Sequence, residues 1–276
     1  MNDAIHSIWS EPLFSGEKYM IEDFEILMMA LSALTWQKYN GNIKLVADEK
    51  VLEYFQSKNL LSLWNGGSEL LEVKESFSAK TFWAAGKLYA LKQQNSPIAV
   101  IDTDFIVWKN IDKLLSGDVV TAHEEEISDV YPAEEYFRMD DMYNFKNLSW
   151  NVNPYNTAFL YIKDMIFKEY YISQSINFMR HCLENRNDVI SMVFAEQRLL
   201  AMCANQWNID VNVLMDYKKL NNQKTFTHIW GYKYTLRNDT IKRKKFCSRC
   251  AKRIKTDFPE MVSILSEISQ TAEYFL

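Results

Sequence analysis

The sequence predicts an α/β fold in which a mostly parallel β-sheet is flanked by helices. Short apolar runs typical of strands alternate with segments of helical periodicity from residue 4 onward. The run Ile98-Ala99-Val100-Ile101 is apolar at every position, as expected of a strand in the covered centre of a parallel sheet. The chain has 276 residues, of which 48% are hydrophobic, with 7 Gly and 5 Pro. It can therefore bury a sizeable core, and its composition excludes a disordered or linker-rich protein.

The first half of the predicted sheet is a β-α-β-α alternation that ends at the apolar run. In chain order its members are a strand at 4–9, a helix at 21–37, a strand at 43–47, a helix at 49–58, a helix at 79–91 and a strand at 98–101. Ser96-Pro97 separates the last helix from the last strand, because proline disfavours a helical residue before it. Such alternation favours parallel strands.

The second half is predicted to return to the same sheet after one long loop. Residues 124–150 are acidic and aromatic without clear periodicity, which is typical of a loop over a site. We expect them to form a flap over the side of the site on which a second substrate, the acceptor, would bind. The expected elements around this loop are strands at 118–122, 156–162 and 211–214 and helices at 172–182 and 189–205. We expect a catalytic domain at 1–240 and a basic, amphipathic helical segment at 241–276.

The formal charge, the lack of long apolar stretches and the first residues disfavour several classes of protein. The formal charge of −5 and the lack of a nucleic-acid-binding motif disfavour a nucleic-acid partner. No apolar stretch is long enough to cross a bilayer and the first residues lack a secretory signal, which predicts a cytoplasmic protein. Basic residues crowd at 242–255, and they are interpreted either as a solvated helix face or as a peripheral contact with an anionic membrane surface.

The four cysteines are expected to be free thiols in a reducing compartment. Cys247 and Cys250 form a C-x-x-C, and a zinc site there would need two further ligands that are not evident nearby. Free thiols are the favoured interpretation, and metal binding by this pair stays the lesser alternative.

Asp102-Thr103-Asp104 follows the apolar strand directly. In an extended chain, alternate residues point to the same side, so both carboxylates can face one cation while Thr103 faces away. Ligands of open α/β sheets bind outside the carboxyl ends of the strands. Mn²⁺ and Mg²⁺ favour oxygen ligands and often bind beside substrate phosphates. The D-x-D therefore predicts a metal–diphosphate site, the alternative being a solvated strand end.

At these residues the chain resembles the GT-A glycosyltransferases, especially the glycogenin-like and galactosyltransferase-like enzymes of family 8 type. Their D-x-D matches Asp102-Thr103-Asp104, and their N-S-G looks like Asn156-Thr157-Ala158. Their D-Q is similar to Glu196-Gln197, and their H-x-x-G matches His228-Ile229-Trp230-Gly231. The motifs occur in the family's order and cover roughly residues 4 to 235, which makes the set more specific than any one match. The resemblance implies a GT-A, Rossmann-like fold with a C-terminal helical appendage.

The resemblance also implies roles for individual residues. Asp102, Asp104 and His228 would hold the metal, Mn²⁺ or Mg²⁺. Glu196 and Gln197 would lie near the transferred sugar as catalytic residues. The donor would be bound by Trp9, Lys87, Asp102, Asn156, Gly231 and Lys233. For three of these residues a structural interpretation stays open: Trp9 as a core tryptophan, Lys87 as a solvated helix lysine and His228 as a hydrogen-bonded strand end.

Three departures from the family pattern make this chain a distant relative. Glu196 stands where the family has aspartate, and Ala158 stands where it has glycine. The family's lysine after H-x-x-G comes one residue early, at Lys233, and a shift of one residue turns a strand side chain to the opposite face. If the segment is a loop, Lys233 can still reach the diphosphate.

The implied reaction moves a sugar from a nucleoside-diphosphate donor, expected to be a UDP-sugar, to a hydroxyl of a carbohydrate or lipid-linked acceptor. The resemblance points to a hexosyltransferase of the retaining kind and to surface polysaccharide or glycolipid synthesis as its setting. Two alternatives stay open. One is a haloacid-dehalogenase-like phosphatase that would use the same D-x-D with Asp140-Asp141 as its later acidic pair. The other is an inactive sugar-nucleotide-binding scaffold.

Overall fold

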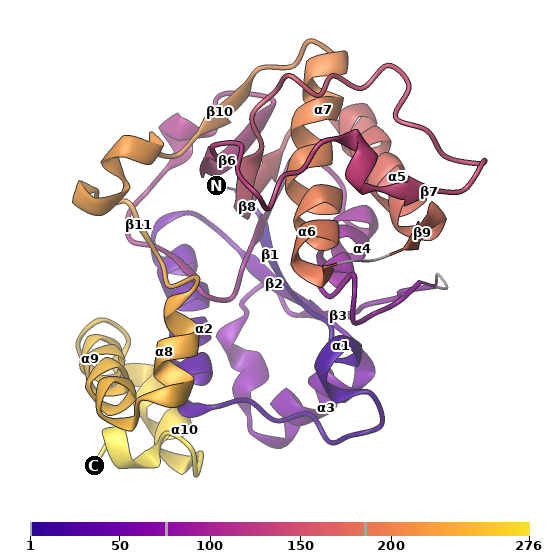
Figure 1. Cartoon of the computed structure of the whole chain (residues 1–276). Coiled ribbons are helices and arrows are strands. Elements are labelled where there is room, and N and C mark those ends of the chain that lie inside the picture. The colour runs from indigo at the N-terminus through magenta and orange to yellow at the C-terminus, as the bar shows by residue number, and fades with distance from the viewer. Residues whose placement is uncertain (1, 75–76, 185–186) are drawn as a thin grey trace.

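The computed structural model describes residues 2–74, 77–184 and 187–276. A seven-stranded sheet runs through the middle of the molecule in the order β10-β6-β8-β4-β1-β2-β3 (Figure 1). Its strands are β1 (Ala4–Ile8), β2 (Ile43–Ala47), β3 (Ser68–Leu70), β4 (Ile98–Ile101), β6 (Val119–Glu124), β8 (Tyr155–Ile162) and β10 (Val211–Val213). All neighbouring strands are parallel except β8, which is antiparallel to both β4 and β6. The predicted mostly parallel sheet is confirmed.

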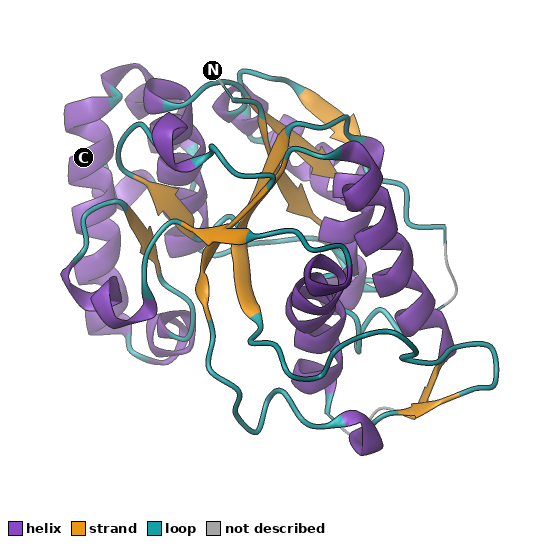
Figure 2. Cartoon of the chain, turned by 90° about the horizontal axis from the view of Figure 1, so that it is seen from above, coloured by secondary structure: helices purple, strands orange, loops and turns teal. Residues whose placement is uncertain are grey.

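Helices cover both faces of this sheet, which confirms the predicted fold class (Figure 2). One face is covered by α2 (Asp23–Tyr39) and α3 (Glu49–Ser57), and α9 (Thr240–Asp257) packs on α2. The other face is covered by α4 (Ala85–Gln93), α5 (Met165–His181), α6 (Asp188–Val193) and α7 (Leu199–Gln206). The remaining helices are α1 (Glu11–Phe14), α8 (Tyr232–Asn238) and α10 (Val262–Glu267).

Two small antiparallel pairs accompany the main sheet. The strands β5 (Phe105–Val107) and β11 (Phe226–His228) pair beside the carboxyl end of β4. The strands β7 (Arg138–Met139) and β9 (Cys182–Glu184) pair at the margin of the α5 layer. The pairing of β11 with β5 therefore brings a segment from late in the chain next to the D-x-D, which immediately precedes β5.

Three predicted helices differ from the observed ones. The helix predicted at 172–182 is longer, because α5 begins at Met165. The helix predicted at 79–91 begins only at Ala85, because residues 79–84 form turns. The helix predicted at 189–205 is interrupted by a π-helical turn, Phe194–Arg198, between α6 and α7. A π-turn inserts an extra residue into the helix and is often found at functional sites.

The long loop at 124–150 is largely irregular, as predicted, but it does not lie free over the sheet. Its buried rings Phe137, Tyr143 and Phe145 pack against Phe178 of α5. The middle of the loop is therefore part of the hydrophobic core on that face.

The helices α9 and α10 contribute to the same hydrophobic cluster as α2. Cys247, Cys250 and Ile254 of α9 are buried there, while most of the basic residues of α9 point outward. Burial raises the pKa of both thiols to about 12, so they stay protonated near neutral pH. No described helix is both long and apolar enough to span a membrane.

A buried polar chain connects the first strand to the beginning of β5. The Trp64 indole N–H donates to His6 Nδ1 at 3.2 Å, and His6 Nε2 lies 3.0 Å from the Ser32 hydroxyl. Ser32 in turn donates to the Phe105 carbonyl at 2.5 Å. Because Nδ1 accepts a hydrogen bond, the ring is satisfied only as a neutral imidazole. Burial lowers the pKa of His6 from 6.5 to about 3, although the Asp102 carboxylate opposes this shift.

This lowered pKa predicts an acid-sensitive fold. Between pH 6.5 and pH 3 the unfolded chain binds a proton at His6 that the native chain does not, so stability falls as the pH drops. The expected loss over this window is on the order of 4 kcal/mol. It can be measured by urea unfolding at a series of pH values. The slope should flatten in His6→Gln and persist in His181→Gln, and an unchanged slope in His6→Gln would contradict the assignment.

Candidate active site

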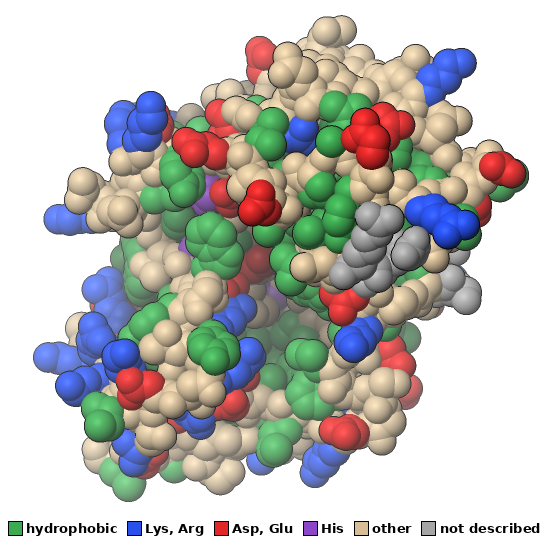
Figure 3. Space-filling view, viewed as in Figure 1, with side chains coloured by type: hydrophobic (Ala, Val, Ile, Leu, Met, Phe, Trp, Pro, Cys, Tyr) green, Lys and Arg blue, Asp and Glu red, His purple; other side chains and the backbone are tan. Residues whose placement is uncertain are grey.

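A cavity of about 540 Å³ opens at the carboxyl ends of β1 and β4. Acidic and histidine side chains show at the floor of this hollow, and much of its rim is apolar (Figure 3). The cavity is lined by nine of the residues implicated by sequence: Trp9, Lys87, Asp102, Asp104, Asn156, Glu196, Gln197, His228 and Lys233. Residues separated by most of the chain therefore share one wall, at the edge of the sheet where α/β proteins bind ligands.

Asp102, Asp104 and His228 form a cluster in which one ligand atom from each lies within 4.8 Å of the others. It is the one cluster of three or more such side chains found in the described part of the chain. The two aspartates follow β4, and His228 reaches them because β11 pairs with β5 in a register that sets it opposite Phe105. His228 Nε2 is 3.7 Å from Asp104 Oδ2. The predicted proximity of these three residues is confirmed.

The donor set of this cluster suits a hard divalent cation. Two carboxylates and one imidazole are ligands that Mn²⁺ accepts readily, and Mg²⁺ is compatible with the carboxylates. Burial lowers the pKa of His228 despite the opposing charges of Asp104 and Asp102, so a neutral nitrogen is available near pH 7. Burial disfavours ionisation of Asp102, but the Lys87 ammonium outweighs it and holds the pKa of that carboxyl below its usual range. Asp102 and His228 are therefore held in the protonation state that metal binding requires.

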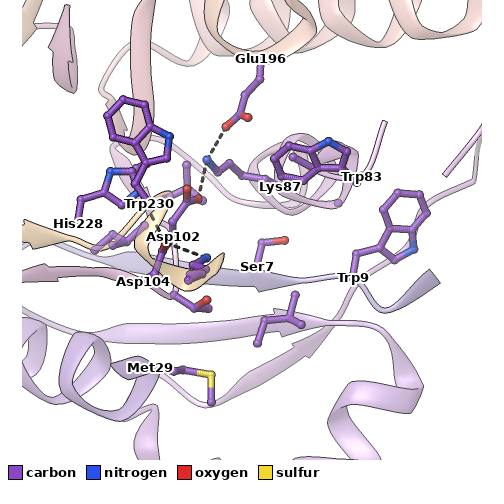
Figure 4. Close-up of a pocket in the computed structure, with 18 of the residues that line it drawn as sticks. Ser7, Trp9, Met29, Trp83, Lys87, Asp102, Asp104, Glu196, His228 and Trp230 are labelled. Carbon is purple, nitrogen blue, oxygen red and sulfur yellow. Dashed lines mark hydrogen bonds and ion pairs between the residues drawn. The ribbon is translucent and has the colours of Figure 1, made fainter. Parts of the chain in front are cut away.

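Lys87 is a buried cation rather than a solvated helix lysine. Its ammonium lies 2.7 Å from Asp102 Oδ1, donates to the Thr157 carbonyl at 2.9 Å and forms a close ion pair with Glu196 (Figure 4). The two carboxylates raise the pKa of Lys87 although burial opposes this, so the lysine stays charged. It is thus the central member of an Asp102–Lys87–Glu196 bridge between β4, α4 and the π-turn.

Glu196 and Gln197 lie in the π-helical turn, and both are fixed by partners that the sequence did not suggest. Glu196 Oε1 accepts a hydrogen bond from the Thr157 hydroxyl at 2.7 Å. The Tyr131 hydroxyl donates to Gln197 Oε1 at 2.6 Å. Thr157 could have been noticed as the middle of the Asn156-Thr157-Ala158 motif, whereas Tyr131 lies in an aperiodic loop and carries no signal of its own.

Lys233 reaches the site despite its shifted position in the sequence. It lies in the first turn of α8 rather than in a strand, and its ammonium is 2.8 Å from Asp104 Oδ2. The face-switching argument for strands therefore does not apply to it. Gly231 precedes α8 and is not among the residues that line the cavity.

Trp9 lines the cavity beside α4, and Gly86 makes this contact possible. A Cβ on Gly86 would lie 2.5 Å from the Cβ of Trp9, which is far too close for any side chain. Trp9 itself is half-buried and meets Phe77 edge-on. Only glycine at position 86 lets α4 approach the strand closely enough to place Lys87 beside Asp102.

We expect Gly86→Ala to destabilise the protein by about 1–3 kcal/mol through overpacking, despite the higher helix propensity of alanine. Gly231→Ala is the matched control, because a Cβ at Gly231 meets nothing within 4 Å and its φ is −66°. That control should change stability by less than about 0.5 kcal/mol. Denaturant unfolding of both variants checks the prediction, and equal stabilities would contradict it.

Asn156 is the second residue of β8, just after the long loop rejoins the sheet. Its Nδ2 donates to Glu125 Oε1 at 3.0 Å, and its Oδ1 accepts from the Ala158 N–H at 3.1 Å. Glu125 was not singled out by sequence, because acidic residues are common throughout that loop.

The acidic pair Asp140-Asp141 does not take part in this cavity. Asp140 accepts a hydrogen bond from His181 at 2.8 Å, and neither aspartate lines the cavity wall. The arrangement that a phosphatase of the haloacid dehalogenase type would need is therefore not assembled here.

Comparison with known proteins gives one family and several distant structural likenesses. A model of a family of unknown function (DUF6734) matches residues 3–268. No curated protein matches the sequence.

Three of the similar solved structures illustrate the distance. The PaToxG glycosyltransferase has a TM-score of 0.43 and 13% identity over 75% of this chain and 69% of its own. The galactosyltransferase LgtC has a TM-score of 0.38 and 8% identity over 71% of each chain. HddC from Yersinia pseudotuberculosis has a TM-score of 0.40 and 13% identity over 83% of this chain and 94% of its own. At such scores the inference of function depends on the cavity itself.

Proposed function

Because this chain belongs to DUF6734, a family of unknown function, its activity must be inferred from the cavity, and we propose that it is a metal-dependent glycosyltransferase. The observation that carries the proposal is the Asp102–Asp104–His228 cluster in one cavity with two ammonium groups. The donor would be a nucleoside-diphosphate sugar, expected to be a UDP-sugar, and the metal Mn²⁺ or Mg²⁺. The acceptor would be a hydroxyl group.

The charges around the cluster suit a diphosphate only together with a divalent cation. Three carboxylates (Asp102, Asp104 and Glu196) and two ammoniums (Lys87 and Lys233) sum to −3 + 2 = −1. A divalent cation changes this sum to +1, which attracts a diphosphate. Glu25, which also lines the cavity, is compensated by Arg237 at 2.7 Å. When bound, the metal would neutralise charge on the leaving diphosphate.

Each lining residue then has a role in the proposed reaction. When the donor binds, the Lys233 ammonium would leave Asp104 and pair with a phosphate oxygen, because the flexible lysine side chain can move toward the more strongly charged group. Asn156 would bond the donor sugar, and Trp9 would lie against the nucleotide. Glu196, held by Lys87 and Thr157, would orient the transferred sugar together with Gln197. Gly231 does not line the cavity, and its part in donor binding stays a prediction from the resemblance. Hexosyl transfer with retention, in surface polysaccharide or glycolipid synthesis, stays a prediction from the resemblance.

A thermal-shift screen tests this proposal. We expect one or more UDP-sugars to raise the melting temperature in the presence of Mn²⁺ and not in EDTA, since a ligand that binds only the native state stabilises it. If no UDP-, GDP-, CDP- or dTDP-sugar shifts the transition with either Mn²⁺ or Mg²⁺, the proposal is wrong.

The second candidate is a sugar-nucleotide-binding protein without turnover. Glu196 replaces the family's aspartate, and both Lys87 and Thr157 contact its Oε1, which is the observation that favours this candidate. Both candidates bind the donor, but only a transferase releases free nucleoside diphosphate. Release of UDP from the shifted donor, with and without saccharide acceptors, separates the two.

The outward face of α9 supports a peripheral membrane contact. Lys245, Arg249 and Lys252 share one helix face and have no ion pair within the described residues, whereas Arg243 and Lys244 are paired with Glu22 and Glu273. An unpaired basic face is attracted to anionic headgroups.

Flotation with phosphatidylserine vesicles should recover the protein, and flotation with pure phosphatidylcholine vesicles should not. The combined variant Lys245→Glu, Arg249→Glu and Lys252→Glu should abolish recovery, and unaltered flotation would rule the contact out.

A further inference from the structure

Trp230 is the most unusual residue of the cavity wall. It is a large aromatic residue that is 56% exposed, and its φ of +29° lies in the left-handed region that favours glycine. A non-glycine residue in such a conformation costs free energy and persists where the surrounding structure holds it, often at a ligand site. The indole is stacked on the metal-ligand candidate His228, with centroids 5.8 Å apart and planes within 4°. A strained and exposed tryptophan is thus fixed against the proposed metal site.

Polar groups suited to hydroxyls lie next to this indole. The ring of His123 is 6.2 Å from that of Trp230, and its Nδ1 is 3.8 Å from Glu125 Oε1. The same Glu125 oxygen accepts the hydrogen bond from Asn156. A carboxylate and a primary amide each keep donor or acceptor capacity beyond the bonds they make here. The wall beside Trp230 therefore combines an apolar plane with hydrogen-bonding edges.

A second hollow of about 310 Å³ lies near Trp230, and the buried His123 ring contacts both Trp230 and Tyr217, a residue of this hollow. This hollow is lined by Glu124, Glu125, Glu126, Asn153, Asp216 and Tyr217, among others. Tyr217 is 45% exposed, and its ring lies 5.7 Å from that of His123. A row of rings, Trp230–His123–Tyr217, thus connects the metal site to a second, acidic cavity.

We propose that Trp230 is the platform of an acceptor subsite that binds an uncharged pyranose. One face of a pyranose ring carries C–H groups that pack on an aromatic plane, while its equatorial hydroxyls bond to carboxylates and amides at the rim. Trp230 offers that plane on the metal side, and Glu125, which Asn156 holds by a hydrogen bond of 3.0 Å, offers the rim. The inference rests on the proposed glycosyltransferase function, because it names the class of acceptor for the same site.

The charge of the second hollow gives the subsite its selectivity. Its carboxylates disfavour an acceptor that carries a carboxylate or phosphate near the reacting hydroxyl, because like charges in a partly buried hollow repel. The acceptor end group is therefore a neutral sugar and not a uronic acid. A second exposed tryptophan of the cavity, Trp83, is 46% exposed and lies across the Lys87–Asp102 pair from Trp230 (Figure 4). Trp83 does not line the acidic hollow.

Saturation-transfer NMR with matched methyl pyranosides tests the subsite. The probes are the methyl β-pyranosides of glucose, galactose and mannose, with methyl β-glucuronide as the anionic match of the glucoside, all in the presence of UDP and Mn²⁺. We expect at least one neutral pyranoside to bind saturably, with its ring C–H protons most strongly saturated, and the glucuronide to bind at least tenfold more weakly. Binding of none of the neutral probes, or equal binding of the glucuronide, would overturn the proposal.

Variants tie the signal to Trp230. Trp230→Ala should weaken binding of the neutral probe at least tenfold, and Trp230→Phe should retain most of it because it keeps an aromatic plane. Trp207→Ala is the matched control, since Trp207 is 40% exposed but stacks near Tyr170, outside the cavity. Binding that survives in folded Trp230→Ala, verified by circular dichroism, would contradict the proposal.

The same samples separate this proposal from the proposed function. A UDP–Mn²⁺ thermal shift without pyranoside binding would leave the donor site standing and remove the acceptor subsite. Pyranoside binding without any nucleotide-dependent thermal shift would contradict the proposed glycosyltransferase function. The pyranoside site could then not be interpreted as an acceptor subsite.

Discussion

Asp104→Ala is expected to abolish metal-dependent donor binding while leaving the protein folded. Asp104 supplies one of the three clustered ligands, and its removal leaves only Asp102 and His228 in the cluster. Loss of partners that only orient metal ligands costs about 10–100-fold in affinity, and loss of a ligand itself should exceed about 100-fold. The measurement is Mn²⁺ titration followed by electron paramagnetic resonance, with the UDP-sugar thermal shift as a second readout.

Asp141→Ala is the control for this experiment. Asp141 is exposed, does not line the cavity and belongs to the acidic pair that a phosphatase interpretation requires. We expect its Mn²⁺ affinity to equal that of the unaltered protein. If Asp104→Ala binds Mn²⁺ as well as this control does, the metal assignment is refuted.

The second large effect is expected from Lys87→Met, which should destabilise the fold by about 3–5 kcal/mol. Removing one member of a buried ion pair leaves the other charge without compensation. Here the uncompensated group is Glu196, whose side chain is only 5% exposed. Urea unfolding measures the loss, and the melting temperature should fall in parallel.

A double mutant shows whether the effect arises from the bridge. Glu196→Gln in the Lys87→Met background removes the uncompensated charge, so the two changes together should cost clearly less than the sum of each alone. Lys92→Met, on the exposed side of the same helix, should change stability by less than about 0.5 kcal/mol. Additive costs for positions 87 and 196 would show that the bridge does not stabilise the fold.

Much of the fold could be predicted because period and apolarity are local properties of the chain. The run at Ile98–Ile101 is a central strand for the reason that predicted it: every side chain is buried. The direction of β8 could not be predicted, since alternation of buried positions is the same for parallel and antiparallel strands. That direction matters, because only an antiparallel β8 places Asn156, at its start, on the edge where β4 ends.

The site was predicted where chemistry is concentrated in short motifs, and missed where it depends on packing. Asp102, Asp104 and His228 could be grouped because their order along the chain matches the ordered motifs of the family that the chain resembles. Tyr131 and Glu125 touch predicted site residues only because the long loop folds back, and its aperiodic sequence gives no sign of this. Whether Lys233 reaches the site depends on its local structure, because in a strand its early position would turn the side chain away. The structure begins a helix at Tyr232 and so brings the side chain to Asp104.

The pairing of β5 with β11 determines when, during synthesis of the chain, the clustered side chains can meet. His228 and Lys233 belong to a segment that the ribosome adds after the main sheet is almost complete, and they reach the aspartates only when β11 has docked. A nascent or truncated chain that ends before residue 226 would carry the D-x-D and most of the sheet but lack the histidine. On the proposed function, metal and donor binding would thus begin only once β11 has been made and has paired with β5.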